Sequence, residues 1–403
     1  MTAIFIALTM LVIIQLIYPV VTIALAQLFG KESLENDQNP EKSHHFACII
    51  TAYKNAAIAL PLVESLLRQS YKEFTIYLVA DECEDLDYDF TDPRFVLLRP
   101  ENPLRLKVRS IRFAVDHFIK QPDFIVVLDA DNLAHPQFLE IINDYVNAGH
   151  CCIQGQRRAK NLDTTYAALD SLGEHYKNYI ERRVPYLLGG SAVISGSGMA
   201  TETQLYLDYL NSKEISLGHE KGKRMLQEDK ILQNFILHKN NKIAYAHQAI
   251  VYDEKVANAQ AVETQRGRWL YSYFQNMPNA LGILDKGIFQ LNFNKAYFGF
   301  VTLVLPMFIQ VGIALMLAFI GLWLAPWYSL AIIASLVLFA AGVIWSLYLD
   351  NAPAPVWKAL KHSPRFIFRQ VRSLWKTRNP DKHFQHTEHN KEVSVDDVLK
   401  PKP

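Results

Sequence analysis

The pattern of apolar and polar positions divides the chain into two regimes. The first 30 residues and the stretch 297–349 are almost wholly apolar, whereas the residues between them have an ordinary globular mixture. About 20 apolar residues cross the hydrocarbon core of a bilayer. Residues 1–30 therefore predict one transmembrane helix, and residues 297–349, which break at Ala325-Pro326, predict two. A cleaved signal peptide is the alternative for the first segment, but that segment lacks a charged start and its apolar run is too long.

Between the apolar ends, short patterns typical of buried strands alternate with amphipathic helical patterns. Strands are expected at 46–51, 74–79 and 124–128, and helices at 57–67, 105–119 and 136–147. Continuous apolar strands alternating with helices indicate a mainly parallel sheet that is covered on both faces. The predicted class is α/β, with three transmembrane helices added, one at the amino end and two at the carboxyl end.

These patterns divide the chain into six segments. The segments are a transmembrane anchor at 1–30, a linker at 31–45, a globular domain at 46–270, an amphipathic interfacial segment at 271–296, two transmembrane helices at 297–349 and a basic tail at 350–403. Lys31 and Lys42 follow the first span, and a basic cluster that begins at Lys358 follows the last. The positive-inside rule therefore predicts a globular domain and a tail on the cytoplasmic side of the plasma (inner) membrane.

The charge balance narrows the class of partner. The formal net charge is +1, and the basic excess is confined to the tail. Because nucleic-acid binding needs a broad basic surface, we expect no nucleic-acid partner. In the tail, Lys358 and the basic residues after it recur at three- and four-residue steps, which on a helix would form a stripe facing anionic membrane lipids. A solvated helix face is the alternative.

Polar clusters follow each of the early strands. The first strand runs into Thr51-Ala52-Tyr53-Lys54-Asn55, the second into a cluster that begins at Asp81, and the third into Asp129-Ala130-Asp131-Asn132. Since ligands of parallel α/β sheets bind at the carboxyl ends of the strands, we expect the three clusters to meet at one edge. A carboxylate after a strand can simply cap the next helix, but three such clusters favour a site.

Asp129 and Asp131 stand two residues apart at the end of a buried strand. In an extended chain both carboxylates can reach one hard cation, such as Mg²⁺ or Mn²⁺, that also bridges phosphates. Such a cation would neutralise the charge that develops on a nucleotide diphosphate leaving group. An isolated Asp-x-Asp pair is common by chance, so the prediction depends on its neighbours.

Six motifs follow one another along residues 46–270. In their order and spacing they resemble the family 2 glycosyltransferases, which include the cellulose, hyaluronan and poly-N-acetylglucosamine synthases. The motifs are Thr51–Asn55, Leu128–Asn132, Gln154–Arg157, Ser195–Met199, Gln227–Asp229 and Gln265–Trp269. The resemblance implies a GT-A type nucleotide-sugar-binding domain, dependent on Mg²⁺ or Mn²⁺.

The resemblance also implies roles for the donor-binding residues. Ala52, Tyr53 and Asp81 would line the pocket for the base and ribose. Lys107 is similar to the family's lysine near the diphosphate, although the usual glycine-rich approach to it is absent. Asp131 would be the metal ligand, with Asp129 in contact with the sugar or nucleotide.

The later motifs carry the chemistry and the acceptor. Asp229 ends a motif similar to Thr-Glu-Asp, with Gln227 in place of threonine, and by the resemblance it is the general base that deprotonates the acceptor hydroxyl. Arg268 would bind the diphosphate through charge-assisted hydrogen bonds. Gln265 and Trp269 would bind the acceptor, the indole stacking on a sugar face. A surface aromatic and its cation is the alternative for this pair.

The predicted function is therefore inverting transfer of a sugar, UDP-linked by the resemblance, to a polysaccharide or glycan acceptor at the cytoplasmic membrane face. Three spans offer few helices for a channel, so a polysaccharide product implies a homo-oligomer or an export partner, and a lipid acceptor is the alternative. A sugar nucleotidyltransferase would need a glycine-rich loop after the first strand, and a phosphatase of the Asp-x-Asp-x-Thr type would need threonine where Leu133 stands. A non-catalytic membrane scaffold is the third rival.

Overall fold

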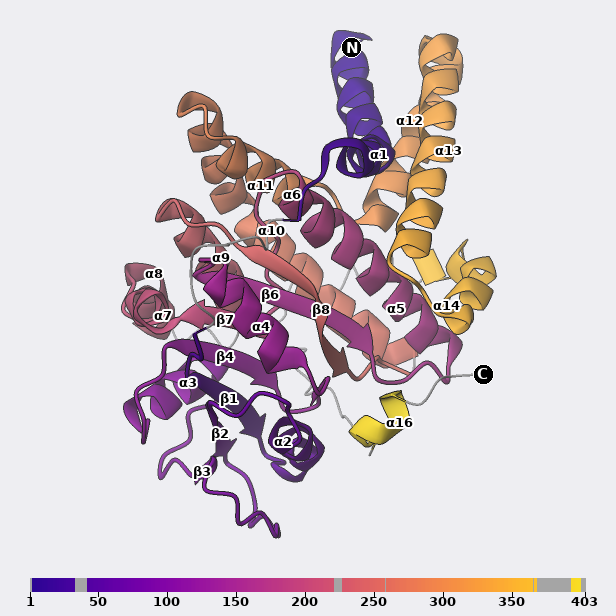
Figure 1. Cartoon of the computed structure of the whole chain (residues 1–403). Coiled ribbons are helices and arrows are strands. Elements are labelled where there is room, and N and C mark those ends of the chain that lie inside the picture. The colour runs from indigo at the N-terminus through magenta and orange to yellow at the C-terminus, as the bar shows by residue number, and fades with distance from the viewer. Residues whose placement is uncertain are drawn as a thin grey trace. The chain divides into compact units, whose positions relative to one another are not determined.

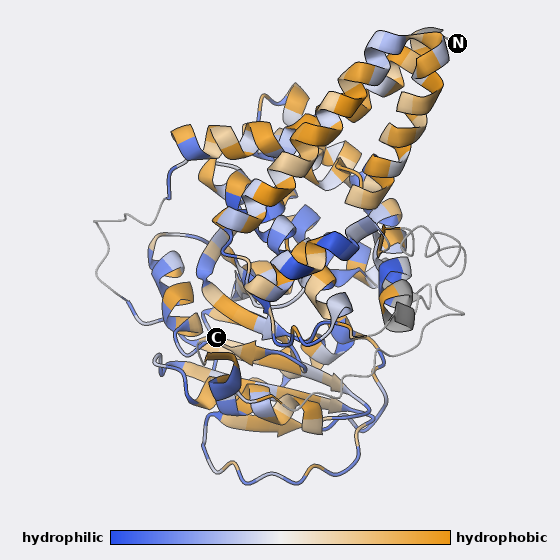
Figure 2. Ribbon diagram, turned by 90° about the vertical axis from the view of Figure 1, so that its right-hand side faces the viewer, coloured by the Kyte–Doolittle hydropathy of each residue, from blue (hydrophilic) through white to orange (hydrophobic). Residues whose placement is uncertain are grey.

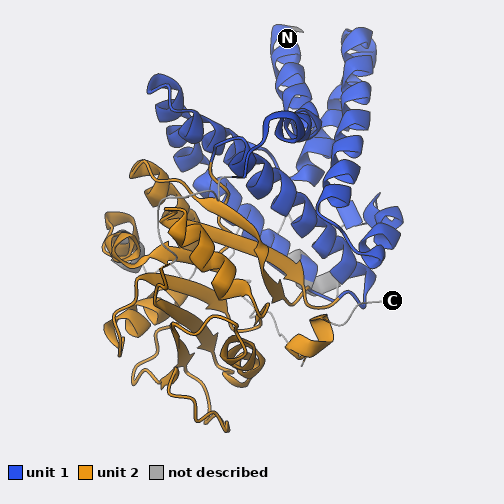
Figure 3. Cartoon of the chain, in the orientation of Figure 1, with its two compact units in different colours: residues 1–32, 162–190, 256–383 blue, residues 33–161, 191–255, 384–403 orange. Residues whose placement is uncertain are grey.

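The computed structural model of the chain describes residues 2–32, 42–220, 227–257, 259–364, 366–367 and 393–399. The predictions for most of the linker and for the basic stripe from Arg365 onward lie outside these residues. The chain forms two compact units (Figure 3), and each is built from separated segments. Unit 1 comprises residues 1–32, 162–190 and 256–383, and unit 2 comprises residues 33–161, 191–255 and 384–403.

Unit 2 contains one eight-stranded sheet with the order β3-β2-β1-β4-β7-β6-β8-β5 (Figure 1). Its strands are β1 (Phe46–Tyr53), β2 (Phe74–Asp81), β3 (Phe95–Leu98), β4 (Phe124–Asp129), β5 (Leu133–Ala134), β6 (Cys152–Ala159), β7 (Met199–Glu202) and β8 (Ala244–Asp253). The four strands from β3 to β4 pair in parallel, and so do β6 and β8. β7 is antiparallel to both of its neighbours, and β5 is antiparallel to β8. The prediction of an α/β fold with a mainly parallel sheet is confirmed.

The helices of unit 2 connect these strands and pack on the sheet. They are η1 (Ala57–Ala59), α2 (Leu60–Leu67), α3 (Lys107–Asp116), α4 (Phe138–Asn147), α7 (Thr203–Leu210), α8 (Lys213–Glu220), α9 (Glu228–His238) and α16 (Val395–Leu399). α3 packs on β1 and β2, α7 on β4 and β7, and α4 on β6 and β8. β2 is buried along its whole length, as expected for an interior strand of a mainly parallel sheet that is covered by helices.

Among its described residues, unit 1 contains helices and no strand. Its helices are α1 (Thr2–Phe29), α5 (Thr165–Lys177), the π-helix η2 (Asn178–Arg183), α6 (Val184–Leu187), α10 (Ala259–Phe289), α11 (Phe293–Leu303), α12 (Met307–Leu324), α13 (Pro326–Leu349), α14 (Ala354–Ala359) and η3 (Leu360–His362). Three of them, α1, α12 and α13, are long and apolar enough to cross a membrane, one at the amino end and two at the carboxyl end, as predicted. Figure 2 shows these helices coloured as hydrophobic along most of their length.

The spanning helices pack on one another through apolar side chains and one close backbone approach. Phe5, Leu16 and Phe339 belong to the apolar cluster that joins α1 to α12 and α13. A Cβ atom on Gly342 of α13 would lie 3.1 Å from the Val20 nitrogen of α1, so glycine permits close contact here.

The first span of the carboxyl-terminal pair begins later than the sequence suggested. Residues 293–303 form the separate helix α11, and Pro306 is the N-cap of α12. Proline lacks a backbone N–H and disfavours a helical conformation in the residue before it, so the chain breaks at Val304-Leu305 rather than running through as one kinked helix.

Gly155 of β6 provides a test of how closely the chain packs beside the candidate site. A Cβ atom at this position would lie 2.6 Å from the Ala249 carbonyl oxygen and 2.9 Å from that of Gly198. Gly155→Ala should therefore lower the free energy of unfolding by about 1–3 kcal/mol, because backbone must shift to admit a methyl group. The control is Gly282→Ala in α10, where a Cβ meets no atom within 4 Å. Thermal unfolding in detergent measures both, and equal melting temperatures for the two variants would contradict the packing described.

Candidate active site

Three strand ends meet at one edge of the sheet in unit 2. In the pairing of β1 with β2, Tyr53 lies opposite Asp81, and in the pairing of β1 with β4, Thr51 lies opposite Asp129. The polar clusters that the sequence placed after separate strands are therefore adjacent in space, as expected for parallel strands.

Asp81 is almost completely buried and fixes the loop that leads into α3. Only 2% of its surface is exposed, and its two carboxylate oxygens accept hydrogen bonds from the backbone N–H groups of Leu104, at 2.8 Å, and Arg105, at 2.6 Å. Arg105 has a φ of 57°, a left-handed conformation that a side chain seldom adopts. A contact between Asp81 and a nucleotide base, which the resemblance implies, would have to share oxygens already bound to these two amides.

Tyr53, a predicted donor-binding residue, forms a polar cluster with Glu82 and Arg105, two residues to which the sequence assigned no role. The Tyr53 hydroxyl hydrogen-bonds to Glu82, and burial together with this carboxylate raises the pKa of Tyr53. Glu82 also accepts two hydrogen bonds of 2.9 Å from the guanidinium of Arg105. Ala52, the other residue predicted to line the base pocket, is buried, and its carbonyl oxygen faces the Cys83 thiol at 3.8 Å.

Lys107 joins three segments of unit 2. Its ammonium lies 2.5 Å from Asp129 Oδ1, 2.7 Å from the Gly196 carbonyl oxygen and 3.8 Å from Glu228 Oε1. Burial alone would lower the pKa of Lys107, but the neighbouring carboxylates, Asp129 first, raise it above its ordinary value. Lys107 is therefore a fixed positive charge at the strand edge.

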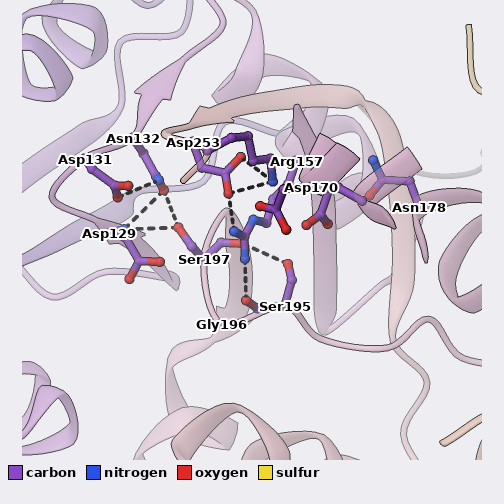
Figure 4. Close-up of polar contacts among 12 residues, drawn as sticks. Asp129, Asp131, Asn132, Arg157, Asp170, Asn178, Ser195, Gly196, Ser197 and Asp253 are labelled. Carbon is purple, nitrogen blue, oxygen red and sulfur yellow. Dashed lines mark hydrogen bonds and ion pairs between the residues drawn. The ribbon is translucent and has the colours of Figure 1, made fainter. Parts of the chain in front are cut away.

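The turn Ser195–Gly198 lies directly beside the end of β4 (Figure 4). The Ser197 hydroxyl donates to Asn132 Oδ1 and accepts from the backbone N–H of Asp129 at 3.0 Å. Gly196 and Gly198 have φ values of 82° and 64°, which glycine adopts without a steric penalty. The small-residue motif thus brings a backbone turn against the Asp-x-Asp segment.

A buried ion pair on the other side of the turn was not foreseen. Arg157 donates to the Ser195 carbonyl oxygen at 2.9 Å and pairs with Asp253, at the end of β8 (Figure 4). Lys255 adds a second cation, 3.0 Å from Asp253 Oδ1. The signal was in the sequence, because β8 also ends in a polar cluster, Asp253-Glu254-Lys255. Its register beside β6 is what could not be predicted.

Asp229 occupies the first turn of α9 and faces the glycine turn. A Cβ atom on Gly196 would lie 3.6 Å from Asp229 Cβ and 3.8 Å from its Oδ2. About a quarter of the side chain is exposed, and the Lys230 ammonium lies 3.5 Å from Oδ2. The predicted base therefore lies at the edge of the same cluster as Lys107.

The described residues do not hold a metal ion by themselves, since no group of three or more His, Cys, Asp or Glu side chains could do so among them. Asp129 is paired with Lys107, and Asp131 accepts a hydrogen bond from Asn132 Nδ2 at 3.2 Å. One or two carboxylates completed by substrate phosphates and water are the usual protein contribution to a Mg²⁺ site. This donor set fits a cation that binds together with a phosphorylated ligand.

Gln265, Arg268 and Trp269 lie on α10 in unit 1. The Trp269 ring centroid lies 4.5 Å from Arg266 Cζ and 5.0 Å from Lys177 Nζ. The ring is thus already in contact with two cations, one of which, Arg266, pairs with Asp170 at 2.5 Å. Burial lowers the pKa of Arg268. Gln265 Oε1 is buried and has no hydrogen-bond partner among the described residues.

Comparison with known proteins identifies the family. Residues 44–272, more than half of the chain, match the family described as "Glycosyltransferase like family 2". The chain belongs to this family. It is a glycosyltransferase with a GT-A fold, and the resemblance seen in its sequence motifs is confirmed.

Among solved structures, the glycosyltransferase is similar to a mannosyltransferase from Pyrobaculum calidifontis, which was solved in complex with GDP-Man and Mn²⁺. The two chains share 14% sequence identity and superpose with a TM-score of 0.50, over 93% of this chain and 99% of the other. At this identity the likeness concerns the fold. No curated protein matches the chain.

Glu228, which the sequence named only as part of a motif, provides a test of the electrostatics of the cluster. Burial raises the pKa of its carboxyl from 4.5 to about 7, while the ammonium of Lys107 opposes this shift and Asp229 reinforces it. The folded protein therefore binds this proton more tightly than the unfolded chain does, and stability falls as pH rises from about 4.5 through 7.

Glutamine at this position has no proton to lose. We therefore expect the stability of Glu228→Gln relative to the wild-type glycosyltransferase to increase by up to about 3 kcal/mol between pH 5 and pH 8, the equivalent of the shift in pKa. Chemical unfolding in detergent without donor or metal measures this difference. The matched control is Glu101→Gln, at an exposed position. A pH dependence identical in wild type and Glu228→Gln would contradict the assignment.

Proposed function

We propose that this glycosyltransferase moves a sugar from a nucleotide-diphosphate donor onto an acceptor hydroxyl in a single inverting displacement, at the cytoplasmic face of a membrane. The observation that carries the proposal is that Lys107 and Asp229 both lie beside Gly196 of the glycine turn. A fixed cation and a carboxylate at neighbouring positions are what phosphate binding and proton removal need.

The donor diphosphate is expected at the edge formed by Lys107, Asp129 and Asp131. The Lys107 ammonium, held by a carboxylate and a carbonyl oxygen, is oriented in advance and would pay little reorganisation to bind a phosphate. A divalent cation bound with the donor would supply Lewis-acid assistance to the departure of the diphosphate. Asp131 is the residue that we expect to hold it, with Mg²⁺ and Mn²⁺ as the candidate ions.

The chemical step then requires a base beside the donor sugar. The Asp229 carboxylate takes the proton of the acceptor hydroxyl as the acceptor oxygen forms a bond to the anomeric carbon. The bond between that carbon and the phosphate oxygen breaks, and the nucleoside diphosphate leaves with the electron pair. Attack opposite the leaving group inverts the anomeric configuration. Three further roles remain predictions from the family motifs. Binding of the nucleotide base and ribose is predicted for Ala52, Tyr53 and Asp81. Binding of the acceptor is predicted for Gln265 and Trp269, and binding of the diphosphate for Arg268.

The identity of donor and acceptor is a finer proposal. UDP is the nucleotide that the motif resemblance implies, whereas the similar mannosyltransferase was solved with GDP-Man. For the acceptor, we propose a polysaccharide or glycan. A lipid acceptor is the second candidate, and the observation in its favour is that only three described helices are long and apolar enough to span a membrane, which is few for a polymer channel.

The base assignment is tested by nucleoside diphosphate release from purified protein in the presence of membrane lipid extract, across a panel of UDP- and GDP-sugars. Asp229→Asn should lower turnover by about 100- to 10,000-fold, the usual contribution of a general base, while equilibrium donor binding stays within about threefold. The matched control is Asp208→Asn, at an exposed position of α7 where the carboxylate accepts a hydrogen bond from Gln204. Full activity in Asp229→Asn would contradict the assignment, and no turnover or binding with any donor would favour a scaffold.

The metal assignment is tested by binding rather than turnover. Donor binding measured by calorimetry should be stronger with Mn²⁺ or Mg²⁺ than with EDTA. Asp131→Asn should reduce the metal-dependent gain in donor affinity by at least about tenfold, since even outer-shell changes at metal sites lower metal affinity or activity by about 10- to 100-fold. Asp116→Asn, at the exposed end of α3, is the control. The assignment is wrong if Asp131→Asn keeps the full metal-dependent gain.

A further inference from the structure

The hairpin formed by α10 and α11 in unit 1 ends in an apex of large, exposed apolar side chains. The exposed fractions are 57% for Ile288, 80% for Phe289, 93% for Leu291 and 58% for Phe293. A loop that faces water normally carries small or polar residues at its tip. Four bulky apolar side chains within six residues form an interaction surface of the kind that another apolar phase covers.

Two polar side chains that directly follow the apex are buried, whereas Gln290 within it is exposed. Lys295 is only 5% exposed, and its ammonium donates to Gln290 Oε1 at 3.1 Å. Asn294 is buried, and the Asn292 side chain accepts the Lys295 backbone N–H at 3.0 Å as the N-cap of α11. Large exposed apolar side chains at the tip, with the buried Lys295 ammonium hydrogen-bonded behind them, are the reverse of a water-facing turn and are typical of a lipid-facing segment.

Leu291 occupies a backbone conformation that favours glycine or asparagine. Its φ is 51°, in the left-handed region, where a branched side chain is sterically disfavoured. A leucine at this position is therefore costly for the turn itself and exposed as well. Its side chain contributes little to packing within the chain, so its benefit must come from what surrounds the apex.

The hairpin is rigid enough to hold this surface in place. A Cβ atom on Gly299 would lie 2.5 Å from the Leu284 nitrogen, and one on Gly287 would overlap the Ala296 backbone. The two helices therefore touch backbone to backbone near the apex, and the Asn292 N–H closes the turn on the Gly287 carbonyl at 2.8 Å. The apolar side chains cannot turn inward without separating the helices.

The far end of α11 lies at membrane depth. The Phe300 ring packs on the Tyr18 ring of α1 at 5.1 Å between centroids, and the Leu305 N–H donates to Gln15 Oε1 at 3.2 Å. Tyr18 precedes Phe29, the last residue of α1, by eleven residues, or about 16 Å of helix at about 1.5 Å per residue. Figure 1 shows the hairpin rising on the side of unit 1 from which α1, α12 and α13 extend.

We propose that residues 288–293 insert into the acyl layer of the bilayer, so that the α10–α11 hairpin is a re-entrant membrane element beside the three spanning helices. This goes beyond an amphipathic segment that lies on the membrane surface, and it does not depend on the proposed catalytic function. The occupant of the apolar surface is lipid, because the hairpin is continuous with the helices that already cross the membrane.

The test places an environment-sensitive fluorophore on single cysteines in the full-length protein, reconstituted into vesicles of phosphatidylcholine and phosphatidylglycerol. Cys83 and Cys151, the two native thiols that are only half-buried, are first replaced by serine. The apex is labelled in Leu291→Cys and, independently, in Phe289→Cys. Quenching by iodide reports exposure to water, and quenching by lipids with a nitroxide on the acyl chain reports insertion.

Two control positions define the outcomes. Asp85, which is fully exposed in unit 2, reports water, and Leu322, on the exposed face of α12, reports lipid. The apex labels should behave like the label in Leu322→Cys, with iodide quenching at least about fivefold weaker than in Asp85→Cys and strong quenching by the nitroxide lipid. Iodide quenching equal to Asp85→Cys would overturn the proposal. Protection from both quenchers would also overturn it, in favour of a protein partner that covers the apex.

Discussion

The ion pairing of the partly buried Lys107 ammonium is the interaction on which the arrangement of the catalytic unit depends. A desolvated charge must be paired, and its partners come from three segments that are far apart in the sequence: Asp129 at the end of β4, the carbonyl oxygen of Gly196 and the carboxyl of Glu228. The position of Lys107 depends in turn on Asp81, which binds the two amides of the loop before α3. The strand edge, the glycine turn and the start of α9 are therefore positioned by one electrostatic network.

A second constraint acts in the membrane unit, where backbone groups must be satisfied without water. The break at Pro306 leaves the backbone of Leu305 outside any helix. Two glutamines compensate for it: Gln15 of α1 accepts the Leu305 N–H, and Gln310 of α12 donates to the Leu305 carbonyl oxygen at 2.6 Å. Irregular backbone is tolerated at membrane depth only with such partners, so α1 and α12 hold the turn that separates α11 from the first carboxyl-terminal span.

Local patterns predicted much of this structure. The strands β1, β2 and β4 could be predicted from their continuous apolar runs and from the helical patterns between them. The three long apolar helices could be predicted from the length of their apolar segments. The meeting of Asp81, Asp129 and Tyr53 followed from parallel pairing alone. The family motifs also singled out Asp229; its side chain lies beside the Gly196 turn, and its role as the base stays a prediction.

What could not be predicted depends on long-range register. The insertion of β7 between β4 and β6 brings Ser197 to Asp129, and the pairing of β6 with β8 brings Arg157 to Asp253. The polar cluster at the end of β8 is visible in the sequence, but neither contact can be predicted without the pairing of these strands. The same holds for the two cations around Trp269, since one of them, Lys177, comes from α5, about 90 residues earlier.

The most direct test of the central claim is the affinity of the purified protein for the nucleoside diphosphate product with Mn²⁺ present, compared between wild type, Lys107→Arg and Lys107→Met. Hydrogen bonds to charged groups contribute about 1.5–3 kcal/mol, so the loss of the ammonium should weaken binding by about 10- to 100-fold, and arginine should restore part of it. Equal affinity in wild type and Lys107→Met, with both folded, would contradict the assignment of the diphosphate to this edge of the sheet.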